Sequence, residues 1–280
     1  MLSYCLVKLE THYPMRYFVF AIALFLTSCD GIVNMMSFHP DKDTYIAEKD
    51  LPDYVRVVKI RTWDSLTIQG LYFSDKKDSV KSKIIVYFHG NAGNMYHRIT
   101  EAAKLFELGC DVLVVSYRGY ARSEGSPSEQ GIYVDGRSAL VFVTHDLGYK
   151  MSDVVIYGRS IGTTVAIDAA KGQDIAKLIL ITPLSSGAAY AEAQGLGWLE
   201  FMVGKPFPST DKINNVKCPL LVIHGDADEV IPQRLGLDLY NHYSGVKKFV
   251  DIPGGGHNNL EFVDPKLYWS SVREFLYGQK

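Results

Sequence analysis

Six short apolar runs, separated by segments long enough for helices, constrain the fold of this chain more than any other feature. The runs read KIIVYFHG, DVLVVSY, DVVIYG, KLILIT, PLLVIHG and KKFVDIP. They are apolar almost throughout, which is typical of strands covered by helices on both faces. Between them we expect helices near 96–108, 130–147, 162–172, 233–243 and 265–278. The pattern therefore predicts an α/β fold whose sheet is mostly parallel, with helices on both sides.

Two earlier runs, VRVVKIRT and LTIQGLYF, lie on either side of Asp64 and Ser65 and predict an antiparallel hairpin. They bring the expected sheet to eight strands. A chain of 280 residues can bury one large core, so we expect one domain over residues 55–280, preceded by a tether over residues 30–54. The net charge of −2 and the lack of a Lys/Arg-rich block argue against a nucleic-acid partner.

The N-terminal region has the pattern of a targeting signal. From residue 15 it reads MRYFVFAIALFLTSCDG, with Arg16 before an apolar stretch at residues 17–26 and small residues before Cys29. This stretch is shorter than the roughly 20 residues of a membrane-spanning helix, so a signal is favoured over the alternative of a transmembrane anchor. The residues LTSC resemble the lipobox of bacterial lipoproteins. That resemblance implies a signal peptide over residues 1–29, lipidation of Cys29 and attachment to the cell membrane on its exported, periplasmic side.

The segment YGRSIGTT contains the pattern G-x-S-x-G, formed by Gly158, Ser160 and Gly162. The pattern alone is weak because glycine and serine are common residues. Here it follows a predicted strand and precedes the helical pattern IGTTVAIDAA. A turn this tight brings the backbone on both sides of the serine close together, so the flanking residues must be small. The context predicts a nucleophile elbow, with the N–H of Ile161 beside the Ser160 hydroxyl.

A serine nucleophile needs a base and an acid that orients the base, which in this order of elements follow as Ser, Asp or Glu, then His. Asp226 and Asp228 follow one predicted strand, and His257 follows the next after three glycines. We prefer Asp228 as the acid, because Asp226 in a Gly-Asp turn is expected to cap local N–H groups. The histidines interpreted as bonded to the backbone or lying on the surface are His89, His97, His145, His224 and His242. Their spacing lacks the pattern of a metal site, so we expect no metal.

The run KIIVYFHGNAGN ends its predicted strand with His89 and Gly90, followed by Asn91. In a parallel sheet this loop is expected beside the elbow, so the backbone N–H of Asn91 and that of Ile161 could form an oxyanion hole. The alternative of a phosphate-binding loop is weakened because the segment lacks the Lys-Ser/Thr pair of a P-loop.

Six motifs in this order resemble the α/β-hydrolase superfamily, and most closely its Bem46-like group, which includes the α/β-hydrolase domain-containing 13 and 17 proteins. The motifs are HGNAGN, SYRGYARSEGSPSEQGIYVD, YGRSIGTTVA, ITPLSSG, CPLLVIHGDADEVIP and PGGGHNNL. The resemblance spans residues 55–278. It implies an α/β-hydrolase fold with strand order 1-2-4-3-5-6-7-8, a triad of Ser160, Asp228 and His257, and no cofactor.

Two departures from the family pattern do not touch the triad: Ser116 stands where many relatives have Asp, and Ala121 where they often have Gly. Arg118, in the YRGY turn, is interpreted as a structural ion-pair donor rather than a substrate ligand. Cys5 and Cys29 belong to the targeting region. With the implied strand order, Cys110 and Cys218 are four strand spacings of ~4.8 Å apart, beyond the ~7 Å limit for a disulfide, so we predict two thiols.

These residues together predict a serine hydrolase that cleaves acyl esters or thioesters through an acyl-enzyme. Relatives of the 17 type remove palmitoyl groups from protein cysteines, which makes a thioester or lipid-like substrate conceivable. Between ITPLSS and Pro219 a short, apolar-rich segment predicts a small cap, which either receives an acyl chain or only packs over the sheet. The alternatives are a serine peptidase of the same fold and a non-catalytic binding lipoprotein on a hydrolase scaffold.

Overall fold

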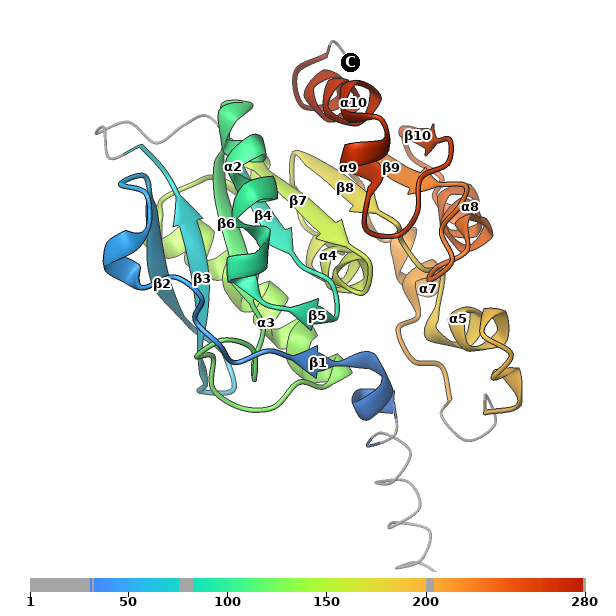
Figure 1. Ribbon diagram of the computed structural model, residues 1–280, viewed down its shortest axis with the longest axis horizontal. Coiled ribbons are helices and arrows are strands. Elements are labelled where there is room, and N and C mark those ends of the chain that lie inside the picture. The colour runs from blue at the N-terminus through green and yellow to red at the C-terminus, as the bar shows by residue number, and fades with distance from the viewer. Residues whose placement is uncertain (1–30, 32, 76–82, 200–203, 279–280) are drawn as a thin grey trace, which may run out of the picture.

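An eight-stranded sheet runs through the centre of the protein, with helices on both faces (Figure 1). The structure, a computed structural model, describes residues 31, 33–75, 83–199 and 204–278. The strands of this sheet are β2 (Val55–Arg61), β3 (Thr67–Phe73), β4 (Ile84–Phe88), β6 (Asp111–Ser116), β7 (Val154–Arg159), β8 (Lys177–Ile181), β9 (Leu220–Gly225) and β10 (Lys247–Ile252). Their spatial order is β10-β9-β8-β7-β4-β6-β3-β2. Strand β3 is antiparallel to both of its neighbours, and the other pairs are parallel. The predicted strand order is confirmed.

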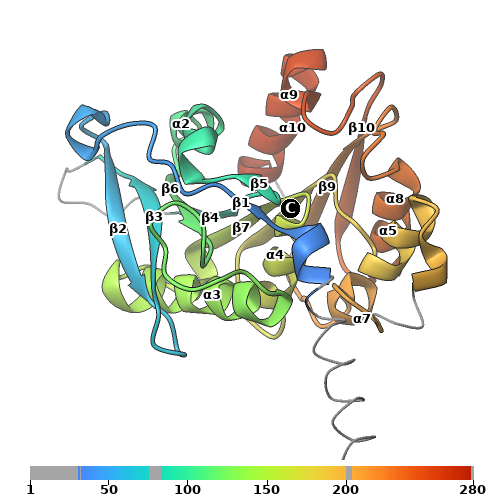
Figure 2. The ribbon, with the colours of Figure 1, turned by 60° about the horizontal axis from the view of Figure 1, so that its bottom comes forward.

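The helices divide between the two faces of the sheet (Figure 2). Those longer than one turn are α2 (Ile99–Glu107), α3 (Glu129–Val141) with its continuation η3 (Phe142–Asp146), α4 (Gly162–Ala170), α5 (Gly187–Ala193), α7 (Ser209–Ile213), α8 (Gln233–His242) and α10 (Pro265–Tyr277). The shorter ones are η1 (Glu48–Asp50), η2 (Met95–Arg98), η4 (Met151–Asp153), η5 (Gly197–Leu199) and α9 (Leu260–Val263). Helices α3, α4 and α8 pack on one face, and α2 and α10 pack on the other.

Two separate apolar cores explain why the central strands are apolar throughout. Along β4, Ile84, Val86 and Phe88 face the core under α3 and α4, whereas Ile85 and Tyr87 face the core under α2 and α10. Side chains of a strand alternate between its faces, so a strand covered on both sides needs apolar residues at every position.

The prediction for the cysteines of the folded domain can be compared with the structure, whereas the predicted signal peptide cannot. Among the described residues, Cys110 and Cys218 are buried and form no disulfide, as predicted. Cys29 and the predicted signal peptide at residues 1–29 lie outside the described residues. No helix within the described ranges is both long enough and apolar enough to cross a membrane.

The described part of the predicted tether is integrated into the fold. Residues 33–37 are helical, and β1 (His39–Pro40) then pairs in parallel with β5 (Ala92–Gly93), directly after Asn91. This pairing brings the N-terminal segment to the loop in which the sequence predicts an oxyanion hole.

Candidate active site

Ser160 lies in the sharp turn between β7 and α4. Its φ of 55° is in the left-handed region, which is strained for a residue other than glycine and is found at functional turns. The backbone N–H of Ser160 donates to the carbonyl of Ile181 in β8 at 2.9 Å, which ties the turn to the neighbouring strand. The turn therefore holds the serine in a fixed position at the carboxyl end of the sheet.

The two flanking glycines are required by close approach of the backbone. A Cβ atom on Gly158 would lie 2.7 Å from the carbonyl oxygen of Gly162, and one on Gly162 would lie 2.2 Å from the carbonyl oxygen of Phe88. Both distances are shorter than any real contact of this kind. The steric reason inferred from the sequence for the glycines around Ser160 is confirmed.

Three side chains that are far apart in the sequence form one relay of hydrogen bonds. The Nε2 atom of His257 is 3.0 Å from the Oγ of Ser160, and its Nδ1 atom is 2.8 Å from the Oδ2 of Asp228. A carboxylate can only accept, so Nδ1 carries the proton and Nε2 is left to accept the serine proton. The side chain of His257 is 10% exposed and that of Asp228 is fully buried. The structure thus brings together the three residues predicted as a triad.

Asp228 receives four donors. The backbone N–H groups of Val230 and Ile231 donate to Oδ1 at 2.9 and 2.8 Å. His224 places its Nε2 atom 3.3 Å from Oδ2, on the oxygen that also receives His257. Burial acts to raise the pKa of Asp228, but the hydrogen bonds from His224 and His257 outweigh it and hold the pKa well below its ordinary value. Asp228 is therefore an ionised carboxylate with both oxygens saturated.

His224 is the residue of this site that the sequence analysis missed. Its predicted bond to the backbone is present, from Nε2 to the carbonyl of Ile231 at 2.9 Å, so the Nε2 proton is shared between this carbonyl and the more distant Oδ2 of Asp228. Its proximity to Asp228, four residues later, was not predicted, although the motif HGDAD contains both residues. Asp226 behaves as expected, because its carboxylate accepts the N–H of Gly254 at 2.6 Å in the loop that leads to His257.

His89 fixes the direction of the Asn91 N–H. Its Nδ1 atom donates to the carbonyl of Gly90 at 2.7 Å, and a trans peptide points its N–H away from its carbonyl. Burial lowers the pKa of His89 to about 3, so the imidazole stays neutral. A Cβ atom on Gly90 would lie 3.4 Å from the Cβ of Ser160, so this loop passes close beside the serine. Asn91 and Ile161 line the same pocket as Ser160.

Arg159, the residue before Ser160, connects the elbow to two helices. Its Nη1 atom lies 3.1 Å from the Oε1 of Glu101 in α2 and 3.3 Å from the Oε1 of Glu261 in α9. Helix α9 directly follows the loop of His257, so these buried ion pairs link the serine turn to the histidine loop. The three residues are too far apart in the sequence for any motif to have indicated the contact.

A pocket of about 420 Å³ opens above Ser160. Its lining is mostly apolar and includes Leu184, Tyr190, Leu196, Phe207, Val230 and Ile231. No charged side chain is found among the described residues that line it. Nor do the described residues contain a group of three or more His, Cys, Asp and Glu side chains placed to hold a metal. A volume of about 300–1,000 Å³ with an apolar lining is typical of a small-molecule site.

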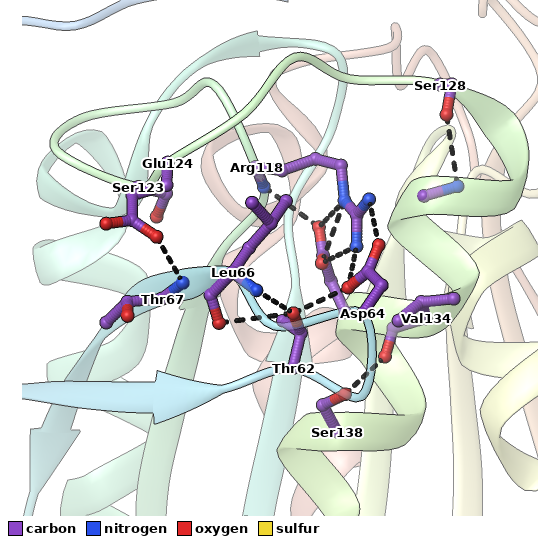
Figure 3. A network of polar contacts seen from close by, with 12 residues as sticks. Thr62, Asp64, Leu66, Thr67, Arg118, Ser123, Glu124, Ser128, Val134 and Ser138 are labelled. Atoms are coloured by element: carbon purple, nitrogen blue, oxygen red, sulfur yellow. Dashed lines mark hydrogen bonds and ion pairs between the residues drawn. The ribbon is translucent and has the colours of Figure 1, made fainter.

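Arg118 lies outside this pocket, in the polar network drawn in Figure 3. Its guanidinium binds Asp135 of α3 through Nε at 3.0 Å and Asp64 of the β2–β3 turn through Nη1 at 2.7 Å. The interpretation of Arg118 as a structural ion-pair donor is confirmed.

Comparison with known proteins gave relatives and structural neighbours of one kind. The fission yeast protein bem46 is 32% identical over 232 residues, which is 80% of this chain and 77% of bem46. The α/β-hydrolase domain-containing protein aho-3 of Caenorhabditis elegans is 35% identical over 193 residues, and the chain spans 57% of its length. The mouse α/β-hydrolase domain-containing protein 17C is 34% identical over 193 residues, 69% of this chain and 59% of that protein. No family model matches the chain.

Solved structures support the same fold. An esterase of Pyrococcus furiosus superposes with a TM-score of 0.69 at 20% identity, covering 86% of this chain and 96% of the esterase. The Est1E structure of Butyrivibrio proteoclasticus, with ferulic acid bound, gives a TM-score of 0.63 at 20% identity, covering 78% of this chain and 97% of Est1E. The identity to bem46 over most of both sequences, together with this fold, places the chain in the Bem46 family of α/β-hydrolases.

Proposed function

We propose that the protein is a serine hydrolase that cleaves acyl esters or thioesters through a covalent acyl-enzyme. The observation that carries the proposal is the relay from Asp228 through His257 to Ser160, which ends on a hydroxyl that lines an apolar pocket. A serine hydroxyl is a weak nucleophile, and a neutral imidazole within hydrogen-bond reach is the group that activates it.

In the acylation step, Ser160 Oγ attacks the acyl carbonyl while His257 Nε2 takes its proton. The Oγ–carbon bond forms, the carbonyl electrons move to oxygen, and the tetrahedral intermediate collapses when His257 gives the proton to the leaving oxygen or sulfur. Asp228 holds His257 in the tautomer with the proton on Nδ1 and stabilises the imidazolium. In deacylation, water replaces Ser160 as the group that His257 deprotonates, and the acid is released.

The backbone N–H groups of Asn91 and Ile161 are proposed to bind the oxyanion. Ile161 lies at the start of α4, where the N-terminal end of a helix favours negative charge. The Asn91 N–H has its direction set by the His89–Gly90 bond. One donor of this kind is worth about 2.7–4 kcal/mol in the transition state.

The lining of the pocket favours esters and thioesters over peptides. Its apolar residues suit an acyl chain, and no charged side chain among the described lining residues could pair with a peptide terminus. The predicted cap contributes Tyr190 and Leu196 to this lining, which supports the alternative in which the cap receives an acyl chain.

The test is hydrolysis of p-nitrophenyl esters from acetyl to palmitoyl, and of a matched acyl thioester series, by the full chain and by Ser160→Ala. We expect the variant to lose about 10⁴-fold or more in kcat. Ser270→Ala, on the exposed side of α10, is the matched control and should retain full activity. Activity that survives in Ser160→Ala would disprove the serine mechanism. A wild-type protein inert to every ester and thioester, and unlabelled by a fluorophosphonate, would favour the binding-protein alternative.

A further inference from the structure

The N-terminal segment forms one wall of the pocket above Ser160. Val33, Met36 and Ser37 line the pocket together with the cap residue Tyr190 and the loop residue Val230. The segment that the sequence presents as a tether is therefore part of the proposed substrate site.

This wall is held in place by contacts on both sides of β1. Phe38 is 5% exposed and packs edge-on against Phe207, with ring centroids 6.2 Å apart. After β1, the side-chain nitrogen of Asn94 donates to the carbonyls of Asp41 and Asp43 at 3.1 and 2.8 Å. Figure 2 shows the short helix at residues 33–37 leading into β1, which runs to β5. The wall thus has a defined orientation relative to Ser160.

The mouth of the pocket carries exposed apolar side chains. Met36 and Val230 line the pocket, yet they are 49% and 42% exposed. Met35 is 71% exposed beside Met36, and Trp198 is 63% exposed two residues after the lining residue Leu196. We refer to Met35, Met36, Trp198 and Val230 as the apolar rim. Two of these residues line the pocket and the other two are exposed near neighbours, in the chain, of lining residues. Exposed apolar side chains next to a pocket mark a surface that binds other apolar groups.

Covalent geometry limits how far this rim can lie from whatever holds the N-terminus. Cys29 precedes Val33 by four residues, so its Cα is at most ~14 Å from that of Val33 even in a fully extended chain. If the apolar stretch at residues 17–26 instead remains as an anchor, Val33 lies seven positions after its last residue, which is at most ~25 Å. Either of these two predicted forms of attachment would keep the rim near the bilayer surface.

We propose that the apolar rim rests on a lipid bilayer and that the pocket takes its acyl chain from that bilayer, so the substrate is a membrane-borne acyl ester or thioester. Methionine and tryptophan side chains gain free energy on leaving water, and tryptophan is enriched at the membrane interface. The lipid contact rests on the apolar rim and on the predicted attachment of the N-terminus. The proposal that the substrate comes from the bilayer also rests on the proposed function, the cleavage of acyl esters or thioesters.

The lipid contact is tested by fluorescence, which does not depend on activity. The full chain has three tryptophans, Trp63, Trp198 and Trp269. In one variant, Trp63→Phe and Trp269→Phe leave Trp198 as the single fluorophore. In the control, all three are changed to Phe and Val246→Trp places the fluorophore at a 76% exposed site before β10, at the opposite, amino end of the parallel strands. Both are bound to phosphatidylethanolamine–phosphatidylglycerol vesicles with or without brominated acyl chains.

We expect bromination to quench more than half of the Trp198 emission and to leave the Val246→Trp emission unchanged. If neither is quenched while the protein floats with the vesicles, the rim faces water or another copy of the chain, and the proposal is wrong. Equal quenching of both would show that the molecule has no preferred face towards the lipid, which also overturns it.

Whether the substrate comes from the bilayer is tested with the full chain bound to vesicles. We compare two rates of hydrolysis, that of umbelliferyl palmitate dissolved in the bilayer and that of water-soluble p-nitrophenyl acetate, and take the ratio of the first to the second. In the double variant Met35→Glu with Trp198→Glu we expect this ratio to fall about tenfold, because carboxylates resist transfer to lipid. Val246→Glu is the matched control and should keep the wild-type ratio.

Two failures are distinguishable in this experiment. Acetate hydrolysis that is absent, or that persists in Ser160→Ala, disproves the proposed function whatever the fluorescence shows. Acetate hydrolysis that depends on Ser160, with the same ratio in all variants, leaves the hydrolase intact and disproves the supply of substrate from the bilayer.

Discussion

Two buried aspartates, Asp228 beside Ser160 and Asp135 in the Arg118 network, use the same chemical group in different ways. Asp135 accepts the Arg118 backbone N–H at 2.8 Å and its guanidinium Nε at 3.0 Å. The partner of Asp135 is therefore a cation. Asp228 instead accepts two backbone N–H groups and two imidazole nitrogens. All four of its donors can be neutral.

The difference in partners decides what each carboxylate can do. The charge of Asp135 is already compensated by Arg118, whose Nη1 and Nη2 atoms also bind Asp64, so the network is closed. The charge of Asp228 stays uncompensated until His257 takes a proton from Ser160, and it then stabilises the imidazolium. Burial raises the pKa of Asp135, whereas the donors of Asp228 hold its pKa well below the ordinary value. The negative charge of Asp228, which has neutral donors, is available to stabilise a cation that forms during the reaction. The charge of Asp135 is already paired with Arg118 and stabilises the fold.

The largest expected effect comes from breaking the closed network. Arg118→Met leaves two carboxylates without their cation, one of them fully buried, and should lower the free energy of unfolding by about 3–5 kcal/mol. The kcat of the molecules that remain folded should not change, because Arg118 does not line the pocket. Urea unfolding and ester kinetics measure the two quantities on the same sample. The exposed Arg234→Met is the control, expected within about 0.5 kcal/mol of wild type. A fall in kcat without a loss of stability would contradict the comparison.

A smaller effect, on rate rather than stability, is expected at His224. His224→Leu removes one donor from Oδ2 of Asp228, and hydrogen bonds to charged groups are worth about 1.5–3 kcal/mol. The distance is 3.3 Å and the same N–H is shared with the carbonyl of Ile231, so this bond belongs at the weak end. We therefore expect kcat to fall about tenfold with little change in KM.

His224→Gln separates positioning from packing. Its side-chain amide can restore a donor where Nε2 stands, so most of the activity should return. If Leu and Gln lower kcat equally, and in proportion to a loss of unfolding free energy, then His224 only supports the packing of the loop.

Local patterns made the elbow and the sheet predictable, because the chemistry that fixes them is contained in adjacent residues. The turn itself requires small residues at Gly158 and Gly162, and the apolar sequence of a strand directly indicates that the strand is buried. Contacts between residues far apart in the sequence produce no local pattern from which they could be predicted. The pairing of His39 with Ala92 and the ion pair of Arg159 with Glu261 join segments 53 and 102 residues apart. The N-terminal wall of the pocket therefore could not be inferred from the sequence.

The smallest expected effect is on stability and concerns Asp64, the partly exposed member of the network of Arg118, Asp135 and Asp64. Hydrogen bonds from Arg118 lower the pKa of Asp64 to about 2 from an ordinary value of 3.8. Because the folded pKa lies below the unfolded one, this contribution to stability is complete above about pH 4 and is lost as the pH falls towards 2. The side chain is 43% exposed, so solvent screening limits the contribution to about 1 kcal/mol or less.

Asp64→Asn should therefore lower the unfolding free energy slightly at pH 7 and make no difference near pH 2. Asp135 acts in the opposite sense, since burial raises its pKa and protonation becomes easier in the folded state. The difference between wild type and Asp64→Asn removes most of this opposing term, except for the part of the Asp135 shift that the charge of Asp64 causes. Urea unfolding at pH 7, 4 and 2.5 measures this difference. A difference that stays constant across this range would show that Asp64 acts through packing rather than charge. The closed network would then owe its stability to the pair of Arg118 with Asp135 alone.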